Sequence, residues 1–257
     1  MTSQPGALQL IHKGKASGHK GWSAARGPRR PYASPVRSNT AQDDMLETKI
    51  DAKKTVLLII DMQNDLVKAE EEPYKAVAEM AKAKGAIGNA AKVVGAARGV
   101  AIPIVFIAHV QRKDNADVIA TVTDVMLQGL VPPARAALVE GSPGADFVEE
   151  LRPTPGDHVV RKRRSNAFYN SDLELILRAR GIDTVIVAGA VTDGCVVNTV
   201  RGARERDLHV IVLSDCCVCV MPEDDEYFMK RAFPKLGRVR TSDEVMRAMS
   251  EAGAGGA

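Results

Sequence analysis

Long apolar runs are absent from this sequence of 257 residues. No stretch is long enough for a helix that spans a membrane or for the apolar segment of a secretory signal peptide. The sequence therefore predicts a protein that is neither inserted in a membrane nor secreted through one, and we expect no membrane partner.

Cysteine is scarce: the chain has 4, and three of them crowd together as Cys216, Cys217 and Cys219. This pattern matches neither a disulfide framework nor the spacing of a tetrahedral zinc site. Because successive residues of a strand point to opposite faces, the three neighbouring thiols do not converge on one ion. We therefore predict no metal, no cofactor and a reducing compartment, the cytoplasm.

Acidic residues are missing before Asp43, from a segment rich in Gly, Pro, Ser and basic side chains. This composition predicts a disordered basic tail over 1–50, followed by one folded domain over 51–250 and a flexible C-terminus over 251–257. Transit peptides can also lack acids, but the repeated Gly and Pro oppose their amphipathic helix. The net charge of +3 comes largely from this tail, so we predict no nucleic-acid partner for the domain.

Strands and helices alternate along the rest of the chain, which favours an α/β fold with a parallel sheet. Ser171 and Glu174 have the spacing of a capping box for a helix over 172–180, and Thr241 with Glu244 repeats it for a C-terminal helix. The remaining predicted elements are strands at Thr55–Ile60, Ile102–Ala108 and Leu208–Leu213, and a helical stretch from Pro73 to Arg98.

A cysteine stands where one of these strands gives way to a helix. The run from Val185 to Thr199 reads as a buried strand, a tight turn and a helix start, with Cys195 at the junction. At a helix N-terminus the unpaired amides and the helix dipole favour a thiolate, so we predict a lowered pKa for Cys195 and a role as nucleophile. The alternative is that Cys195 packs as a small buried side chain, as free cysteines usually do.

Two charged residues also stand at strand ends. Asp61 directly follows the strand Thr55–Ile60, where ligands bind in open α/β sheets; the alternative is an aspartate that caps the next turn. Lys162 belongs to a run of four basic residues, which could simply be solvated. If the strand continues through the run, its alternation places Lys162 and Arg164 on one face.

The residues around these three positions carry a family resemblance. They read Ile-Ile-Asp-Met-Gln-Asn-Asp-Leu at Asp61, Lys-x-Arg-x-Asn-Ala-Phe from Lys162, and Ala-Gly-Ala-Val-Thr-Asp-Gly-Cys-Val at Cys195. In order and spacing they resemble the isochorismatase-like cysteine hydrolase family, over about Lys54 to Val245. The resemblance implies a single three-layer α/β domain with a mostly parallel, roughly six-stranded sheet flanked by helices. It also implies a homo-oligomer, either a dimer or a tetramer.

The resemblance further implies a catalytic triad of Asp61, Lys162 and Cys195. Cys195 would attack an amide-type carbonyl, expel ammonia or an amine, and leave a thioester for water to hydrolyse. Asp61 would take and return the proton, while the Lys162 ammonium favours the thiolate. By the same resemblance, the backbone N–H groups of Val191 and Cys195 form the oxyanion hole, and a cis peptide between Ala190 and Val191 turns the Val191 amide into the pocket.

The sequence indicates a class of substrate but does not identify one compound. We expect a small linear amide or ureide: an N-carbamoyl compound, ureidoacrylate or a biuret-like molecule. Polar and aromatic residues near the motifs are candidates for binding it, although each could instead be a surface or packing residue. These candidates are Gln63, Asn64, His109, Arg164 and Phe168.

Three other functions stay open. A nicotinamidase resembling other members of this family would need a zinc site with several histidines, but no histidine follows His109 between 110 and 139. Isochorismatases proper hydrolyse an enol ether without a cysteine nucleophile, so the presence of Cys195 favours amide or ureide hydrolysis. A non-catalytic family member would carry a Cys195 thiol no more reactive than the other three.

Overall fold

The protein is described here by a computed structural model, which covers residues 48–114, 116–117 and 137–254. The predicted basic tail, apart from its last three residues, and residues 255–257 lie outside the described part of the chain. Within the described ranges, no helix is both long enough and apolar enough to cross a membrane.

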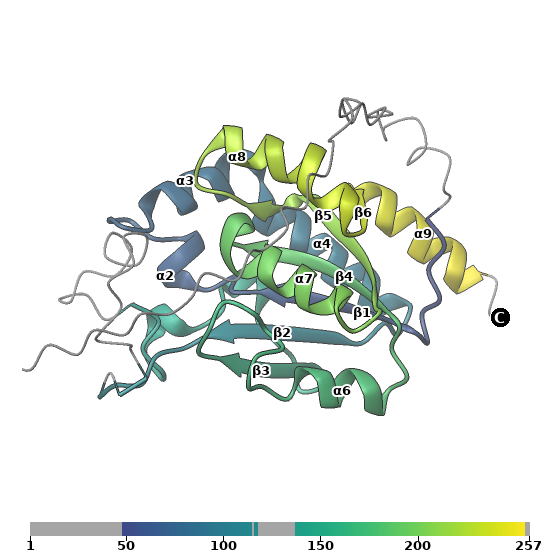
Figure 1. Cartoon of the computed structure of the whole chain (residues 1–257), viewed down its shortest axis with the longest axis horizontal. Helices are drawn as coiled ribbons and strands as arrows, with labels where there is room; N and C mark the ends of the chain where they lie inside the picture. The colour runs from purple at the N-terminus through teal and green to yellow at the C-terminus, as the bar shows by residue number, and fades with distance from the viewer. Residues whose placement is uncertain (1–47, 115, 118–136, 255–257) are drawn as a thin grey trace, which may run out of the picture. The chain divides into compact units, whose positions relative to one another are not determined.

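One six-stranded sheet forms the centre of the described fold (Figure 1). Its strands run in the order β3-β2-β1-β4-β5-β6, and every neighbouring pair is parallel. This confirms the predicted α/β fold and sheet. The strands are β1 (Thr55–Ile60), β2 (Ile104–His109), β3 (His158–Lys162), β4 (Thr184–Ala190), β5 (His209–Val218) and β6 (Arg238–Arg240).

Helices cover both faces of the sheet. Residues of α3, α4 and α9 pack in one core layer, and residues of α6 and α7 pack in the other. The α-helices are α2 (Asn64–Val67), α3 (Lys75–Lys84), α4 (Ala86–Gly99), α6 (Leu173–Ala179), α7 (Val197–Arg204), α8 (Pro222–Tyr227) and α9 (Ser242–Ala254). Short 3-10 turns span Pro143–Ala145, Glu149–Leu151 and Phe233–Lys235, and π-helical turns span Thr192–Val196 and Phe228–Ala232.

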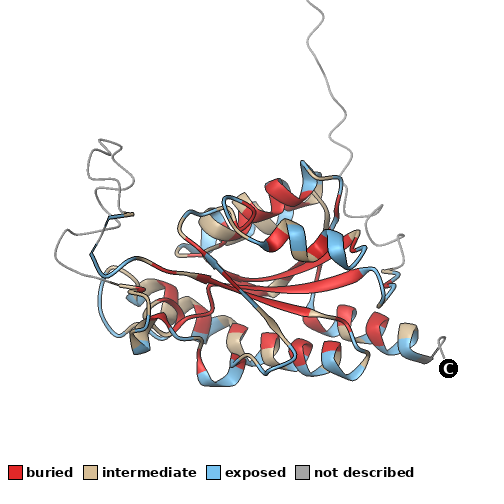
Figure 2. Cartoon of the chain, turned by 90° about the horizontal axis from the view of Figure 1, so that it is seen from below, coloured by how far each residue is buried: buried red, intermediate tan, exposed pale blue. Residues whose placement is uncertain are grey.

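The apolar strands read as continuous runs because both of their faces are covered. In β1, Leu57 and Ile59 join the layer of α3, α4 and α9, whereas Val56, Leu58 and Ile60 join the layer of α6 and α7. Figure 2 shows the central strands buried and the helices buried only on their inward sides. Strands β1 and β4 are buried throughout, whereas the edge strands β3 and β6 include partly exposed residues. The same alternation separates two neighbouring thiols, since Cys216 lies in the first layer and Cys217 in the second.

Three local predictions differ from the structure. The helical stretch from Pro73 to Arg98 is divided into α3 and α4, because Gly85 adopts a left-handed conformation with φ 62° that ends the first helix. The capping box of Ser171 and Glu174 does not form, since the Glu174 carboxylate pairs with Arg206 instead, at 2.6 Å from Nε. Helix α9 continues to Ala254, four residues past the predicted end of the domain.

The C-terminal capping box does form. Thr241 N donates to Glu244 Oε2 (2.6 Å), and Glu244 N donates to Thr241 Oγ1 (3.3 Å). Together these bonds occupy backbone donors at the start of α9, which confirms the helix start that the sequence predicts.

Candidate active site

Four neighbouring strands bring polar side chains to one edge of the sheet. Lys162 ends β3, His109 ends β2, Asp61 follows β1, and Cys195 lies in the turn after β4. The order β3-β2-β1-β4 makes these strands consecutive, and parallel pairing places their carboxyl ends at the same edge. Strands β2 and β3 are added on one side of β1, and strands β4, β5 and β6 on the other, so β1 and β4 flank the point where the strand order switches. In open α/β folds, ligands bind at the carboxyl ends of the strands at this point.

Asp61 is held in a left-handed conformation at the end of β1. Its φ is 51°, a region that aspartate tolerates better than most residues with a Cβ, and its N–H donates to Ile107 O (2.8 Å). The side chain is fully buried. Its Oδ2 atom pairs with Lys162, and no hydrogen-bond partner of Oδ1 is found among the described residues.

The neighbouring strand approaches Asp61 so closely that only glycine fits. Gly189 of β4 has a φ of 150°, and a Cβ atom there would lie 2.2 Å from Ile60 O and 2.7 Å from Ile60 Cβ. This contact sets the spacing of β1 and β4 one residue before Asp61. The sequence places Gly189 at a strand end but does not reveal this contact.

Lys162 is a buried cation that contacts both of the other predicted triad members. Its Nζ lies 2.7 Å from Asp61 Oδ2, with both side chains fully buried, and donates to Cys195 Sγ at 3.1 Å. Burial lowers the pKa of Lys162, but its interactions with the Asp61 carboxylate and with the Cys195 sulfur outweigh burial, so the net pKa is raised. The ammonium is therefore charged at neutral pH.

Cys195 lies in a π-helical turn that links β4 to α7, and the peptide bond between Ala190 and Val191 just before this turn is cis. Although part of the residue is accessible, its thiol has the surroundings of a buried group. Burial and the Asp61 carboxylate raise the pKa of the thiol from 9.0 to about 12, although Lys162 acts in the opposite direction. The prediction of a lowered pKa is therefore wrong for the unliganded site, because desolvation and a nearby carboxylate outweigh the lysine.

His109 lies next to the same lysine. Its Nδ1 is 3.4 Å from Lys162 Nζ, and the residue is half-buried. Burial and the Lys162 ammonium lower the pKa of His109 to about 4, so the imidazole is neutral at neutral pH. Of the five residues proposed from the sequence for substrate binding, His109 contacts the Lys162 side chain, whereas Gln63 contacts Asp61 only through the backbone, its N–H donating to Asp61 O (2.8 Å).

Gln63 and Asn64 are engaged in holding the backbone. The Gln63 side chain is fully buried; its Nε2 donates to His109 O (3.0 Å) and Ala145 O (2.7 Å), and its Oε1 accepts from His109 N (2.9 Å). Asn64 Nδ2 donates to Pro143 O (2.9 Å). These bonds engage the Gln63 amide and the Asn64 Nδ2 group with the backbone, and the role of both residues in substrate binding stays a prediction.

Phe168 and Arg164 have other partners in the structure, and their role in substrate binding stays a prediction. Phe168 is a core residue beside α6 and α7, with the Arg206 guanidinium 4.6 Å from its ring centre. Strand β3 ends at Lys162, so the alternation invoked for Arg164 stops before it. Arg164 is exposed and donates to Asp117 O (3.2 Å), although its positive charge contributes to the low pKa of His109.

Two groups of side chains in the described ranges could hold a metal ion. The ligand atoms of Asp61, His109 and Cys195 lie within 4.8 Å of one another, but the Lys162 ammonium contacts all three, so a metal ion would have to displace it. The second group, Asp193, Cys219 and Asp224, combines two exposed carboxylates with a buried thiol.

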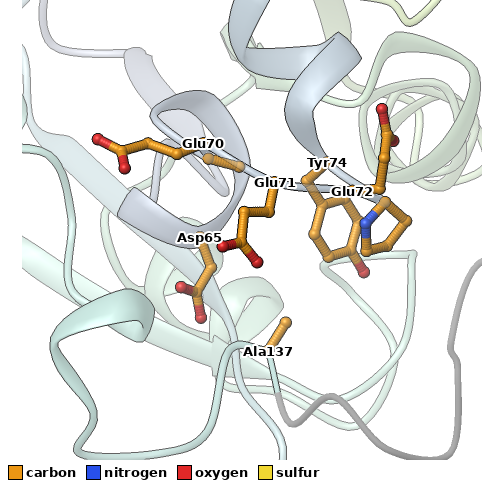
Figure 3. A pocket seen from close by; sticks show the side chains of 8 residues that line it. Asp65, Glu70, Glu71, Glu72, Tyr74 and Ala137 are labelled. Carbon is orange, nitrogen blue, oxygen red and sulfur yellow. The ribbon is translucent and has the colours of Figure 1, made fainter.

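A pocket of about 280 Å³ opens near the site, lined by Asp65, Ala69, Glu70, Glu71, Glu72, Pro73, Tyr74 and Ala137. Figure 3 shows the Asp65 and Glu71 carboxylates and the Tyr74 ring around one space, whereas Glu70 points away from it. Burial raises the pKa of Tyr74.

Comparisons with known proteins agree with this fold. A family model for the isochorismatase domain matches residues 55–244. The ureidoacrylate amidohydrolase RutB from Variovorax paradoxus (strain S110) is 29% identical over 199 residues, which cover 74% of this chain and 78% of that protein.

Solved structures give the same relationship. A cysteine hydrolase from Pseudomonas syringae pv. phaseolicola 1448A superposes with a TM-score of 0.66 at 27% identity, covering 79% of this chain and 95% of that one. The N-carbamoylsarcosine amidase from Thermoplasma acidophilum gives a TM-score of 0.57 at 28% identity, covering 74% of this chain and 97% of that one.

Proposed function

The chain belongs to the isochorismatase family of hydrolases, and we propose that it hydrolyses the C–N bond of a small amide or ureide with Cys195 as nucleophile. One observation carries the proposal: a fully buried Asp61–Lys162 ion pair touches the thiol through Lys162 Nζ, 3.1 Å from the sulfur. Burying a carboxylate and an ammonium together is unfavourable unless both are paired, and residues with such perturbed surroundings cluster at functional sites.

In the first half of the reaction, the Cys195 proton passes to Asp61 as the sulfur attacks the substrate carbonyl. The high thiol pKa of about 12 means that this transfer accompanies substrate binding instead of preceding it. The C–N bond then breaks, and Asp61 returns the proton to the leaving nitrogen, which departs as ammonia or an amine. The product at this stage is a thioester on Cys195.

In the second half, water attacks the thioester carbonyl while Asp61 accepts one of its protons. The C–S bond breaks, the thiol regains its proton and the carboxylic or carbamic acid leaves. Throughout, Lys162 keeps its charge: its ammonium stabilises the thiolate whenever the sulfur is the leaving group or the attacking group. The backbone N–H groups of Val191 and Cys195 are the proposed donors to the tetrahedral oxyanion.

The substrate class comes from the relatives. The names of two of them specify ureidoacrylate and N-carbamoylsarcosine, which are both linear ureides with a terminal carbamoyl group. We therefore favour an N-carbamoyl, ureidoacrylate or biuret-like substrate. The homo-oligomeric state and the cytoplasmic location stay predictions.

Ammonia release by the purified protein tests the proposal, measured over a panel of N-carbamoyl amino acids, ureidoacrylate, biuret and nicotinamide without added metal. We expect release from at least one linear ureide and none from the Cys195→Ala variant. The matched control is Cys216→Ala, which also removes one buried thiol but lies in the opposite core layer from Cys195 and should keep turnover.

The outcomes separate the candidate functions. Hydrolysis that survives Cys195→Ala would refute the nucleophile, and release that depends on added metal would indicate a nicotinamidase-type reaction. Failure of both wild type and control across the whole panel would refute the assignment to linear ureides.

A further inference from the structure

The Lys162 ammonium has three protons to donate and three acceptors around it. Its Nζ lies 2.7 Å from Asp61 Oδ2, 3.1 Å from Cys195 Sγ and 3.4 Å from His109 Nδ1. An ammonium carries three N–H donors and no acceptor, so these contacts use its full capacity. The third acceptor belongs to a residue that the proposed reaction does not use.

His109 is held in place by the fold. Gln63 binds both backbone groups of His109 through its buried amide: Oε1 accepts from His109 N (2.9 Å), and Nε2 donates to His109 O (3.0 Å). Register in the sheet adds to this, since His109 of β2 pairs directly with Lys162 of β3. The backbone from which the imidazole extends is therefore fixed beside the Lys162 ammonium.

The charge state of His109 agrees with an acceptor role. Because the raised pKa of Lys162 keeps its nitrogen protonated, the contact requires an unprotonated Nδ1 on His109. The lowered pKa of His109, about 4, provides that neutral ring. The charged and titratable groups that face the ring from neighbouring elements are Asp61, Asp117, Lys162, Arg164 and Cys195.

We propose that His109 is a positioning residue: by accepting the third proton of Lys162 at Nδ1, it holds the ammonium where it contacts both Asp61 and Cys195. This proposal rests on the proposed function, in which Lys162 stabilises the Cys195 thiolate. Without the third acceptor, one N–H of a buried ammonium is left unpaired, and the lysine turns away from the sulfur to satisfy it. The thiolate then loses part of its stabilisation.

Three substitutions of His109 test the contact. His109→Asn keeps an acceptor near the position of Nδ1, whereas His109→Gln carries its acceptor farther out, and His109→Leu has none. We expect His109→Leu and His109→Gln to lower kcat by about ten- to a hundredfold, the range for a lost hydrogen bond to a charged group, with little change in KM. His109→Asn should lower it by no more than about threefold.

Alkylation of Cys195 by iodoacetamide gives a readout that needs no substrate, followed by mass spectrometry of the Cys195 peptide between about pH 7 and pH 10. At each pH, alkylation should be slower in His109→Leu and His109→Gln than in the wild type, and in His109→Asn it should stay close to the wild-type rate. A residue that only supports the fold would change the unfolding temperature without changing these rates.

The comparison remains decisive if one variant does not fold, because His109→Asn and His109→Gln are both polar and differ in where the acceptor lies. Equal effects of the Asn and Gln variants, or wild-type alkylation in His109→Leu, would overturn the proposal. The proposed function fails separately, when Cys195→Ala retains hydrolysis.

Discussion

The resting Cys195 thiol should resist alkylation at neutral pH, unlike the activated thiolates of many cysteine enzymes. Burial and the Asp61 carboxylate raise its pKa to about 12, against 9.0 for an ordinary thiol. At a pH well below both of these pKa values, the fraction of thiolate falls tenfold for each unit by which the pKa rises. The thiolate fraction of Cys195 is therefore about a thousandfold smaller than that of a free cysteine. The alkylation rate should therefore rise tenfold per pH step up to at least about pH 10.

Asp61 and Lys162 act on the Cys195 pKa in opposite directions, so removing either charge should change the alkylation rate in opposite directions. Asp61→Asn removes the carboxylate that opposes the thiolate, so alkylation at a fixed pH should become faster by about tenfold or more, although turnover is lost. Lys162→Met removes the charge that favours the thiolate, so alkylation should become slower. A general loss of structure would speed both variants alike.

The assay is the rate of iodoacetamide incorporation at Cys195, resolved by peptide mass spectrometry because Cys216, Cys217 and Cys219 are also free thiols. Their burial raises their pKa values as well, so they serve as internal references in every sample. A rate that reaches a plateau near neutral pH would refute the reasoning, since it would mean a thiolate already formed at rest. Slower alkylation in Asp61→Asn would refute the assigned effect of the carboxylate.

Two further predictions concern the groups that hold the site. Gln63→Ala removes three side-chain hydrogen bonds, so the free energy of unfolding should fall by about 3 kcal/mol and the melting temperature by roughly 6–12 °C. Asn64→Ala should change both quantities far less, and equal melting temperatures for the two variants would contradict the role of Gln63 in holding the backbone. Gly189→Ala places a methyl group 2.2 Å from Ile60 O and should reduce both the stability of the fold and turnover. Gly95→Ala, in α4, adds a methyl group with no atom within 4 Å and should raise stability by up to about 1 kcal/mol. Calorimetry that ranks these two variants the other way would refute the close contact at Gly189.

Much of the fold could be predicted because its signals are local. The strand Thr55–Ile60 was found at its exact bounds, since an apolar run between turn residues reads the same alone or in the sheet. Helix 172–180 appears as α6, one residue shorter at each end. The break at Gly85 was missed because the surrounding residues favour helix on both sides, and one left-handed residue decides the boundary.

The candidate site was predictable to the extent that it follows strand ends. Asp61, Lys162 and Cys195 could be singled out because polar residues interrupt apolar runs there. The contacts of Gln63 and Phe168 could not be predicted, because an amide or a ring in a motif reads the same whether it faces a substrate or the core.

The sequence by itself determined the class of fold, the family and the three residues at the strand ends, because periodicity, turn residues and motifs are local properties of the chain. Only the tertiary structure decided that β3, β2, β1 and β4 are neighbours, and hence that His109 lies beside Lys162. It also decided the sign of the shift in the Cys195 pKa, since desolvation and charge depend on everything that surrounds the thiol in space.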